Sequence, residues 1–201
     1  MNRLTFLLLA VAVASLTACT PRARIRGADE ESLVGDRRAG AAVYRTVIDQ
    51  ALIELSTKYR AQIRNDLDQS RIKVAFMGID NRTNEELGAW RDQINDIINS
   101  ALNESGDFLD ISFEYYVVPA LRRASVNKED LVLPADYRRF AEVLEASGRP
   151  LDALLYGRLS QGDTRSGNLT QSDYLLTFEL MNPLNGTRLN ATGELSKEYA
   201  R

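Results

Sequence analysis

The chain has 201 residues, of which 44% are hydrophobic and 26% charged, and its net charge is −3. This length and composition are those of one ordinary globular domain with a leader segment and an accessory helix. The small negative charge gives no electrostatic basis for binding nucleic acid. Because the sequence contains no histidine, it excludes a Ser-His-Asp triad, a Cys-His pair and every histidine-ligated metal site. With a single cysteine, Cys19, it also excludes a disulfide within the chain.

Residues 1–18 have the pattern of an export signal. Arg3 precedes an apolar run from Leu4 to Val13, which is too short for a transmembrane helix, and small residues follow. The segment ends in Leu16-Thr-Ala-Cys19, which places the only cysteine of the chain at the expected cleavage point. This ending resembles the bacterial lipoprotein box, in which the cysteine carries lipid. The alternative is an ordinary secretory signal in which the cysteine is incidental.

Acyl chains on Cys19 would anchor the mature chain to a membrane, since each buried CH₂ group contributes about 0.8 kcal/mol. In bacterial lipoproteins, an aspartate after the cysteine commonly retains the protein at the inner membrane, whereas this chain has Thr20. The resemblance therefore implies a lipid-anchored protein on the periplasmic face of the outer membrane. Residues 19–36 lack hydrophobic periodicity and are expected to form a flexible tether after the anchor.

Residues 37–70 are expected to form an accessory helix. Between Ala39 and Asn65, apolar residues recur at intervals of three and four, as on one face of a helix: Tyr44, Ile48, Leu52, Leu55, Tyr59 and Ile63. One interpretation is that this face packs against the sheet of the following domain. The other is a helix that binds a partner or a membrane surface, although its opposite face has no strong basic bias.

Residues 71–201 are expected to form an α/β domain that begins with a buried strand at Ile72–Ile79. A polar loop follows, and four residues are expected to organise it and the start of the next helix: Asn81, Arg82, Thr83 and Glu86. Thr83 and Glu86 have the spacing of a capping box, so a helix is expected to begin there. Its apolar stripe includes Trp90, which is expected to be buried.

The rest of the domain changes from a helical to an alternating period. The expected elements are a strand at Phe108–Val118, a short helix from Pro119 to about Val126, a helix from Pro134 to Gly148, a strand at Asp152–Ser160, a hairpin loop at residues 161–170, a strand around Tyr174–Met181, a tight turn at Asn182–Gly186 and a last strand at Thr187–Ser196. The order is thus a helix followed by β-α-β-α-β-β-β. It predicts an α/β (α+β) fold, a small mixed sheet with helices on one face.

Several segments resemble the LpoB family of outer-membrane lipoproteins. They are Val74-Ala-Phe-Met-Gly-Ile-Asp-Asn-Arg-Thr-Asn84, Asn99-Ser-Ala-Leu102, Asp152-Ala-Leu-Leu-Tyr-Gly157 and Asn185-Gly-Thr187, and the lipoprotein box agrees with them. Members of this family bind and activate a bifunctional penicillin-binding protein, and thereby regulate peptidoglycan synthesis. The resemblance implies a protein-binding domain that is not an enzyme and needs no cofactor, metal or small-molecule substrate. The fold also resembles the N-terminal domain of TolB and domains of curli-secretion lipoproteins.

The resemblance also points to residues at the partner surface. Tyr156 matches a family tyrosine there, and Arg138 and Arg139 are further candidates. The alternatives are a core tyrosine on a sheet face and, for Arg139, a solvated helix charge. The last strand has Asn190 where the family tends to place an aromatic residue.

Two other functions stay open. The family's best-known members have a long proline-rich tether, whereas residues 19–36 contain one proline, so the alternative is an envelope-assembly or secretion-associated structural lipoprotein with a TolB-like binding domain. An enzyme would have to rely on Asp80, Glu85 and Glu86, which follow the end of a strand. Turn formation and the helix dipole explain these carboxylates without general acid or base catalysis.

Overall fold

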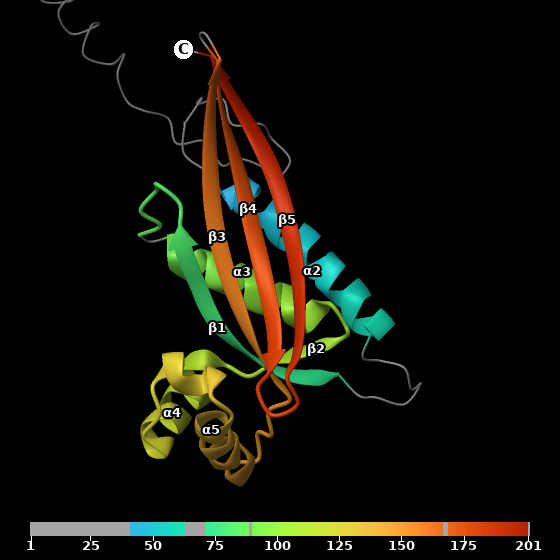
Figure 1. The fold of residues 1–201 in the computed structure, drawn as a ribbon, viewed down its shortest axis with the longest axis vertical. Coiled ribbons are helices and arrows are strands. Elements are labelled where there is room, and N and C mark those ends of the chain that lie inside the picture. The colour runs from blue at the N-terminus through green and yellow to red at the C-terminus, as the bar shows by residue number, and fades with distance from the viewer. Residues whose placement is uncertain (1–40, 63–70, 89, 167–168, 201) are drawn as a thin grey trace, which may run out of the picture. The chain divides into compact units, whose positions relative to one another are not determined.

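The computed structural model describes residues 41–62, 71–88, 90–166 and 169–200 (Figure 1). The predictions for the signal segment, for the lipid anchor at Cys19 and for the tether lie outside these residues. Within the described part of the chain, no helix is long and apolar enough to cross a membrane.

The domain is built on a five-stranded sheet in the order β2-β1-β3-β4-β5. The central strand β1 (Ile72–Arg82) pairs in parallel with β2 (Phe108–Asp110) and with β3 (Ala153–Ser166). β4 (Leu169–Asn182) and β5 (Thr187–Ala200) continue the sheet as antiparallel strands. The predicted α/β class, the mixed sheet and the order of the elements are confirmed.

The β3–β4 hairpin is longer than the sequence predicted. A loop was expected at residues 161–170, but β3 and β4 stay paired as far as Ser166 and Leu169. Figure 1 shows these strands extending well past α3 (Trp90–Glu104). Most β3 side chains beyond Gln161 are exposed, so this part of the strand lacks the apolar alternation by which a strand is recognised.

One face of the sheet is covered by α3 and by α2 (Ala41–Gln62). α2 contributes seven buried side chains to this main core: Tyr44, Val47, Ile48, Ala51, Leu52, Leu55 and Tyr59. They pack with alternate residues of the strands, such as Phe76 and Phe178, whose rings meet edge to face at 6.4 Å between centroids. The helix therefore belongs to the folded domain.

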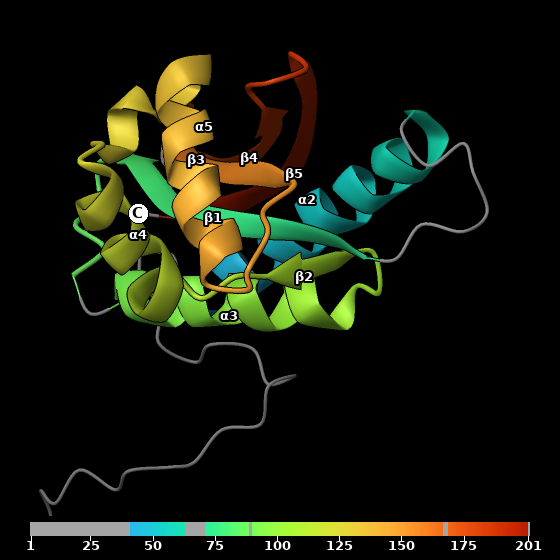
Figure 2. The same ribbon diagram turned by 90° about the horizontal axis from the view of Figure 1, so that it is seen from below.

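A second, smaller core lies on the opposite side of β1, where the sequence predicted no helices. Val74 and Phe76 face the main core, whereas Ala75 and Met77 face α4 (Val118–Ala124), η3 (Lys128–Val132) and α5 (Pro134–Ala146). Figure 2 shows α3 and α5 on either side of β1. The expectation of helices on one face alone is thus corrected, because β1 buries both of its faces.

The apolar segment after β2 is helical, not extended as predicted. β2 has three residues, and a π-helix, η2 (Phe113–Val117), continues directly into α4. A short apolar run fits a buried helix as well as a strand, so periodicity alone does not separate the two. The expected burial of Trp90 is also wrong, since this residue begins α3 and is 41% exposed.

The capping box predicted at Thr83 and Glu86 does not form, because α3 begins at Trp90. Instead, the Asn81 side chain closes a turn. Its Oδ1 accepts hydrogen bonds from the backbone N–H and the hydroxyl of Thr83 at 3.1 and 2.8 Å, and its Nδ2 donates to the Glu85 carbonyl at 2.8 Å. Asparagine and threonine act here by the side-chain-to-backbone bonding typical of turns.

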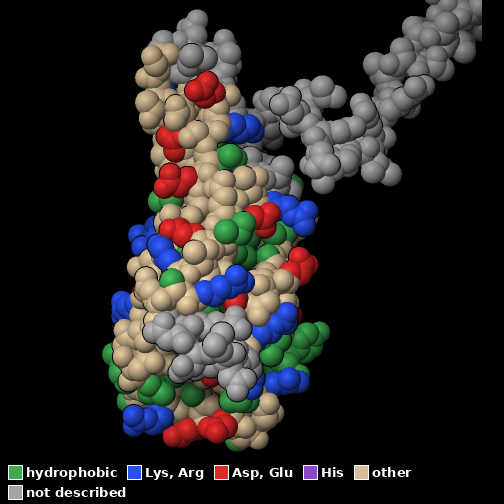
Figure 3. Space-filling model, turned by 90° about the vertical axis from the view of Figure 1, so that its right-hand side faces the viewer, with side chains coloured by type: hydrophobic (Ala, Val, Ile, Leu, Met, Phe, Trp, Pro, Cys, Tyr) green, Lys and Arg blue, Asp and Glu red, His purple; other side chains and the backbone are tan. Residues whose placement is uncertain are grey.

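The free edge of β5 is covered by polar side chains of α2. Lys58 Nζ donates to the Asn190 carbonyl at 2.8 Å, the Glu194 N–H donates to Gln50 Oε1 at 3.0 Å, and the Thr192 N–H donates to Glu54. These bonds occupy backbone groups that an open edge would offer to another strand. Figure 3 shows the side of the molecule on which α2 and β5 lie, with acidic and basic side chains interspersed over it.

Candidate functional site

A groove of about 760 Å³ opens on the sheet face opposite α2, and we call it the sheet groove. β3, β4 and β5 contribute alternate residues to it, such as Thr177 and Glu179, and its other wall comes from β1 and η3. It is lined by Gly78, Ile79, Asp80, Lys128, Glu129, Val132, Tyr156, Gly157, Arg158, Thr177, Glu179, Met181, Arg188 and Asn190. Charged and apolar side chains are therefore brought together from four strands and a short helix.

Tyr156 lies in the sheet groove, on β3 directly opposite Glu179 of β4. Its ring packs against the second core, and its hydroxyl is buried without a hydrogen-bond partner among the described residues. Burial, and after it the negative charges of Glu179 and Glu129, raises the pKa of Tyr156 to about 12. A buried polar group without a partner is uncommon in folded proteins and calls for an explanation.

A bulge in β1 shapes the wall beside Tyr156. The pairing of β1 with β3 shifts between Phe76 and Ile79, and Gly78 there has a φ of 87°, which favours glycine. Lys128 of η3 packs over this glycine, since a Cβ atom built on it would lie 3.7 Å from the lysine Nζ. Burial lowers the pKa of Lys128, while the charges of Glu129 and Asp80 oppose that shift.

The carboxylates of the sheet groove are bound mainly by arginines. Asp80 Oδ2 is 2.9 Å from Arg82 Nε and 3.8 Å from Arg158 Nε, and Glu179 Oε1 is 3.3 Å from Arg188 Nη1. These pairs are largely exposed, so each contributes little to stability. The ion pairs do fix the positions of these positive and negative charges in the groove.

No protein-family model and no curated protein matches the sequence. Solved structures do resemble the fold. The LpoB C-terminal domain from Salmonella enterica matches with a TM-score of 0.49 at 17% identity, covering 77% of this chain and 98% of that chain. The LpoB structure from Escherichia coli matches at 0.46 and 14%, covering 90% and 85%. A lipoprotein from Neisseria meningitidis matches at 0.40 and 14%, covering 64% and 83%.

These similarities concern the backbone fold alone. LpoB is also the family whose motifs the sequence resembles. At these identities and TM-scores, the likeness describes neither a partner nor a binding residue.

The structure separates the three residues predicted at the partner surface. Arg138 and Arg139 lie exposed on α5, where Arg139 pairs with Asp136, and neither lines the sheet groove with Tyr156. Asn190, in contrast, lies in the groove. A role of Tyr156, Arg138 or Arg139 in binding stays a prediction.

The sequence analysis did not identify three basic residues of the sheet groove: Lys128, Arg158 and Arg188. Strand alternation was the signal for Arg158, which lies two residues from Tyr156 and hence on the same face. Lys128 had no such signal, because it lies on η3, which packs against β1 through tertiary contacts.

The three carboxylates considered for catalysis have different surroundings. Glu85 accepts hydrogen bonds from the hydroxyls of Tyr174 at 2.8 Å and Tyr44 at 3.5 Å, which connects the loop to β4 and α2. Asp80 is paired with arginines, and Glu86 is exposed. Among the described residues, no group of three or more acidic or cysteine side chains is arranged to hold a metal ion.

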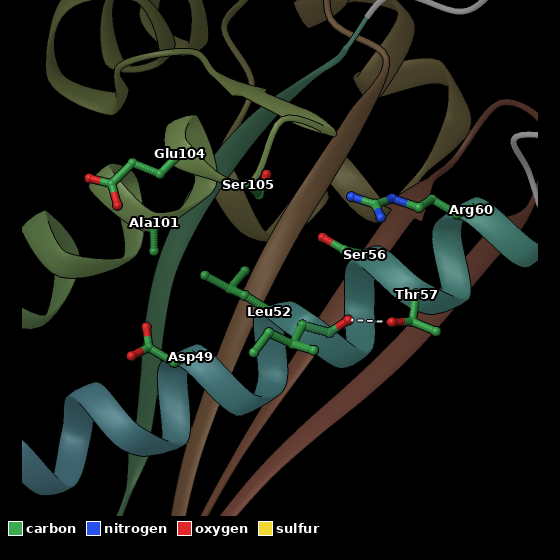
Figure 4. Close-up of a pocket in the computed structure, with 9 residues that line it drawn as sticks. Asp49, Leu52, Ser56, Thr57, Arg60, Ala101, Glu104 and Ser105 are labelled. Atoms are coloured by element: carbon green, nitrogen blue, oxygen red, sulfur yellow. Dashed lines mark hydrogen bonds between the residues drawn. The ribbon is translucent and has the colours of Figure 1, made fainter. Parts of the chain in front are cut away.

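A second cavity of about 490 Å³ lies between α2 and α3 (Figure 4). Its polar groups largely serve the helices themselves. The Thr57 hydroxyl donates to the Ile53 carbonyl at 2.8 Å, and Arg60 Nη2 is 2.7 Å from Asp107 Oδ2. We therefore take the sheet groove, with its unpartnered hydroxyl, as the candidate site.

Asp110 at the end of β2 provides a test of burial in this fold. Its Oδ1 is buried without a hydrogen-bond partner among the described residues, and burial raises its pKa from an ordinary 3.8 to about 6, although a bond from the Phe76 N–H acts the other way. The native state therefore binds more protons than the unfolded state between pH 4 and 6. Stability is expected to fall as pH rises through this window.

Asp110→Asn is expected to remove this fall and to stabilise the protein by about 1–2 kcal/mol at pH 7.5, because a neutral amide keeps an acceptor for Phe76 without a desolvated charge. Partial exposure of Asp110 keeps the gain below the full effect of the pKa shift. Urea unfolding of the wild type and of Asp110→Asn at pH 4 and 7.5 measures the free energy of unfolding of each protein and its change with pH. Equal pH dependence in the two proteins would contradict the prediction.

Proposed function

We propose that this chain is an outer-membrane-anchored periplasmic lipoprotein that binds and activates a bifunctional penicillin-binding protein through the sheet groove. One observation carries the proposal: Tyr156, which the family resemblance assigns to the partner surface, lies in the largest of the described pockets with an unpartnered hydroxyl. The lipoprotein box at Cys19 supports the anchoring. In this proposal the protein regulates peptidoglycan synthesis by docking and catalyses no reaction itself.

The chemistry of the sheet groove supports a protein partner. Protein interfaces are enriched in tyrosine, methionine and arginine, and the groove contains a half-buried tyrosine, Met181 and flanking arginines. Ile79 and Val132 add apolar surface that is compatible with such an interface. The charges on the walls are largely paired before a partner arrives, so docking requires little rearrangement of the groove.

The packing of α2 favours a second candidate, an envelope-assembly or secretion-associated lipoprotein with the same binding face. Because α2 is part of the main core, it adds nothing to the tether. The segment from Cys19 to Ala41, about 22 residues, spans at most about 75 Å when fully extended. A partner close to the outer membrane is within easier reach of this anchor than one in the inner membrane.

A photo-crosslinking amino acid at Thr177 distinguishes the two candidates. Thr177 lies in the sheet groove on β4, and we expect it to capture a bifunctional penicillin-binding protein in living cells. The matched control is the same amino acid at Ile53, which is 69% exposed on α2 and lies outside this groove. Adducts are identified by mass spectrometry.

The crosslink is paired with a direct assay of activation. The purified lipidated protein in detergent is expected to raise glycan-chain polymerisation by the purified synthase several-fold. An adduct that holds only outer-membrane assembly or secretion components, together with an unchanged polymerisation rate, would replace the activator function by the second candidate.

A further inference from the structure

We infer that the partner places an acidic side chain in the sheet groove and that the Lys128 ammonium receives its carboxylate. The inference rests on the proposed function, in that it requires the groove to dock a protein. The inference adds the chemical group that the partner must present, a carboxylate, and the residue of this chain that binds it, Lys128.

Among the described residues, Lys128 is the basic side chain of the sheet groove that forms no ion pair with a carboxylate. It is half-buried between the bulge at Gly78 and the ring of Phe113, whose centroid is 5.8 Å from Nζ. Among the described residues, its Nζ has neither a hydrogen bond nor a carboxylate within 4.0 Å. The ring face offers a weak attraction that does not replace a counter-ion.

Among the described residues, no acid of the sheet groove forms an ion pair with this lysine. Asp80 is held by Arg82 and Arg158, and Glu179 is held by Arg188. Glu129 is the next residue along the chain, and it and Asp80 act on Lys128 through their charges without an ion pair. The arginines thus hold Asp80 and Glu179, and the Glu129 carboxylate is not within 4.0 Å of the lysine Nζ, so Lys128 remains a positive position that a partner can complement.

A half-buried ammonium without a partner has already lost part of its hydration, so a carboxylate that pairs with it gains more than at an exposed lysine. The surrounding side chains indicate the source of that carboxylate. Ile79, Val132 and Met181 line the same groove and offer contacts to the residues that flank an acidic side chain in a polypeptide. We therefore assign the acid to an aspartate or glutamate of the protein partner.

Lys128→Met tests this assignment because methionine keeps the length of the apolar stem and removes the charge. With purified lipidated proteins in detergent, titration of the penicillin-binding protein by calorimetry is expected to show an affinity about tenfold lower for the variant, with a weaker dependence on salt. Lys73→Met is the matched control, since Lys73 lies outside the sheet groove. The affinity of this control variant for the penicillin-binding protein is expected to stay within twofold of the wild-type value.

Folding of the variant is checked separately. Lys128 Nζ makes no hydrogen bond or ion pair among the described residues, so Lys128→Met is expected to unfold in urea at the same midpoint as the wild type or at a higher one. If the affinity falls while the unfolding midpoint is unchanged, the loss results from a change in the docking surface and not from unfolding.

Changing aspartates and glutamates of the synthase to their amides identifies the acid. One such change is expected to weaken binding of the wild-type protein and to have no further effect on Lys128→Met, which is the signature of a direct pair in a double-mutant cycle. If the wild type binds and Lys128→Met binds within twofold of it, the inference is wrong and the proposed function stands. If the wild type does not bind the synthase, the proposed function itself fails.

Discussion

A chain that begins at Arg71, without α2, is expected not to reach the native state. Although periodicity alone leaves residues 37–70 as a separable accessory helix, α2 buries seven side chains in the main core, including Leu55 and Val47 at 0% exposure. Full burial of one large apolar side chain contributes about 1.5–3 kcal/mol. Without the small Ala51, the other six together contribute about 9–18 kcal/mol, which is as large as the 5–15 kcal/mol by which a typical domain is stable.

The matched control is a chain that begins at residue 37 and keeps α2. We expect this control to unfold cooperatively in urea, and the shorter chain to bind a hydrophobic dye and to aggregate, because the sheet face around Phe178 and Leu189 loses its cover. A cooperative transition of the shorter chain at the midpoint of the control would show that α2 is dispensable. In that case, α2 would again be available as part of the tether.

The sequence predicted well those elements whose periodicity is set by burial on one side. The stripe of α2, the buried strand β1 and the Pro134 start of α5 all follow from the spacing of apolar residues and from proline at a first helical position. The turn at Gly186, with its φ of 72°, follows from local turn chemistry. Each of these signals lies within a few residues of the element that it predicts.

The sequence failed where tertiary context decides. The run at Phe113–Val117 is apolar because it is buried, and burial permits a strand or a helix. The far end of the β3–β4 hairpin is polar because it is exposed, so its backbone pairing left no hydrophobic signal. In the sheet groove, Tyr156 was singled out by its motif, whereas Lys128 lies there because η3 packs against β1, which no local sequence pattern indicates.

Gly193→Ala is expected to destabilise the protein by about 3 kcal/mol or more, because α2 crosses β5 directly over this glycine. A Cβ atom at position 193 would lie 1.9 Å from the Val47 carbonyl oxygen and 3.0 Å from the Ala51 backbone N. These atoms belong to the backbone of a buried helix, so no side-chain rotation relieves the overlap. α2 would have to move away from β5 and lose the bonds that cover the strand edge.

Gly162→Ala is the matched control for Gly193→Ala, since it lies in the same sheet with no atom within 4 Å of the added Cβ position, and it is expected to change stability by less than about 0.5 kcal/mol. Urea unfolding measures both variants, and hydrogen exchange of α2 amides reports whether the helix has detached. If Gly193→Ala were as stable as the control, α2 would have room to move on β5. A loss of stability together with faster exchange of the α2 amides would show that the close contact at Gly193 holds the helix on β5.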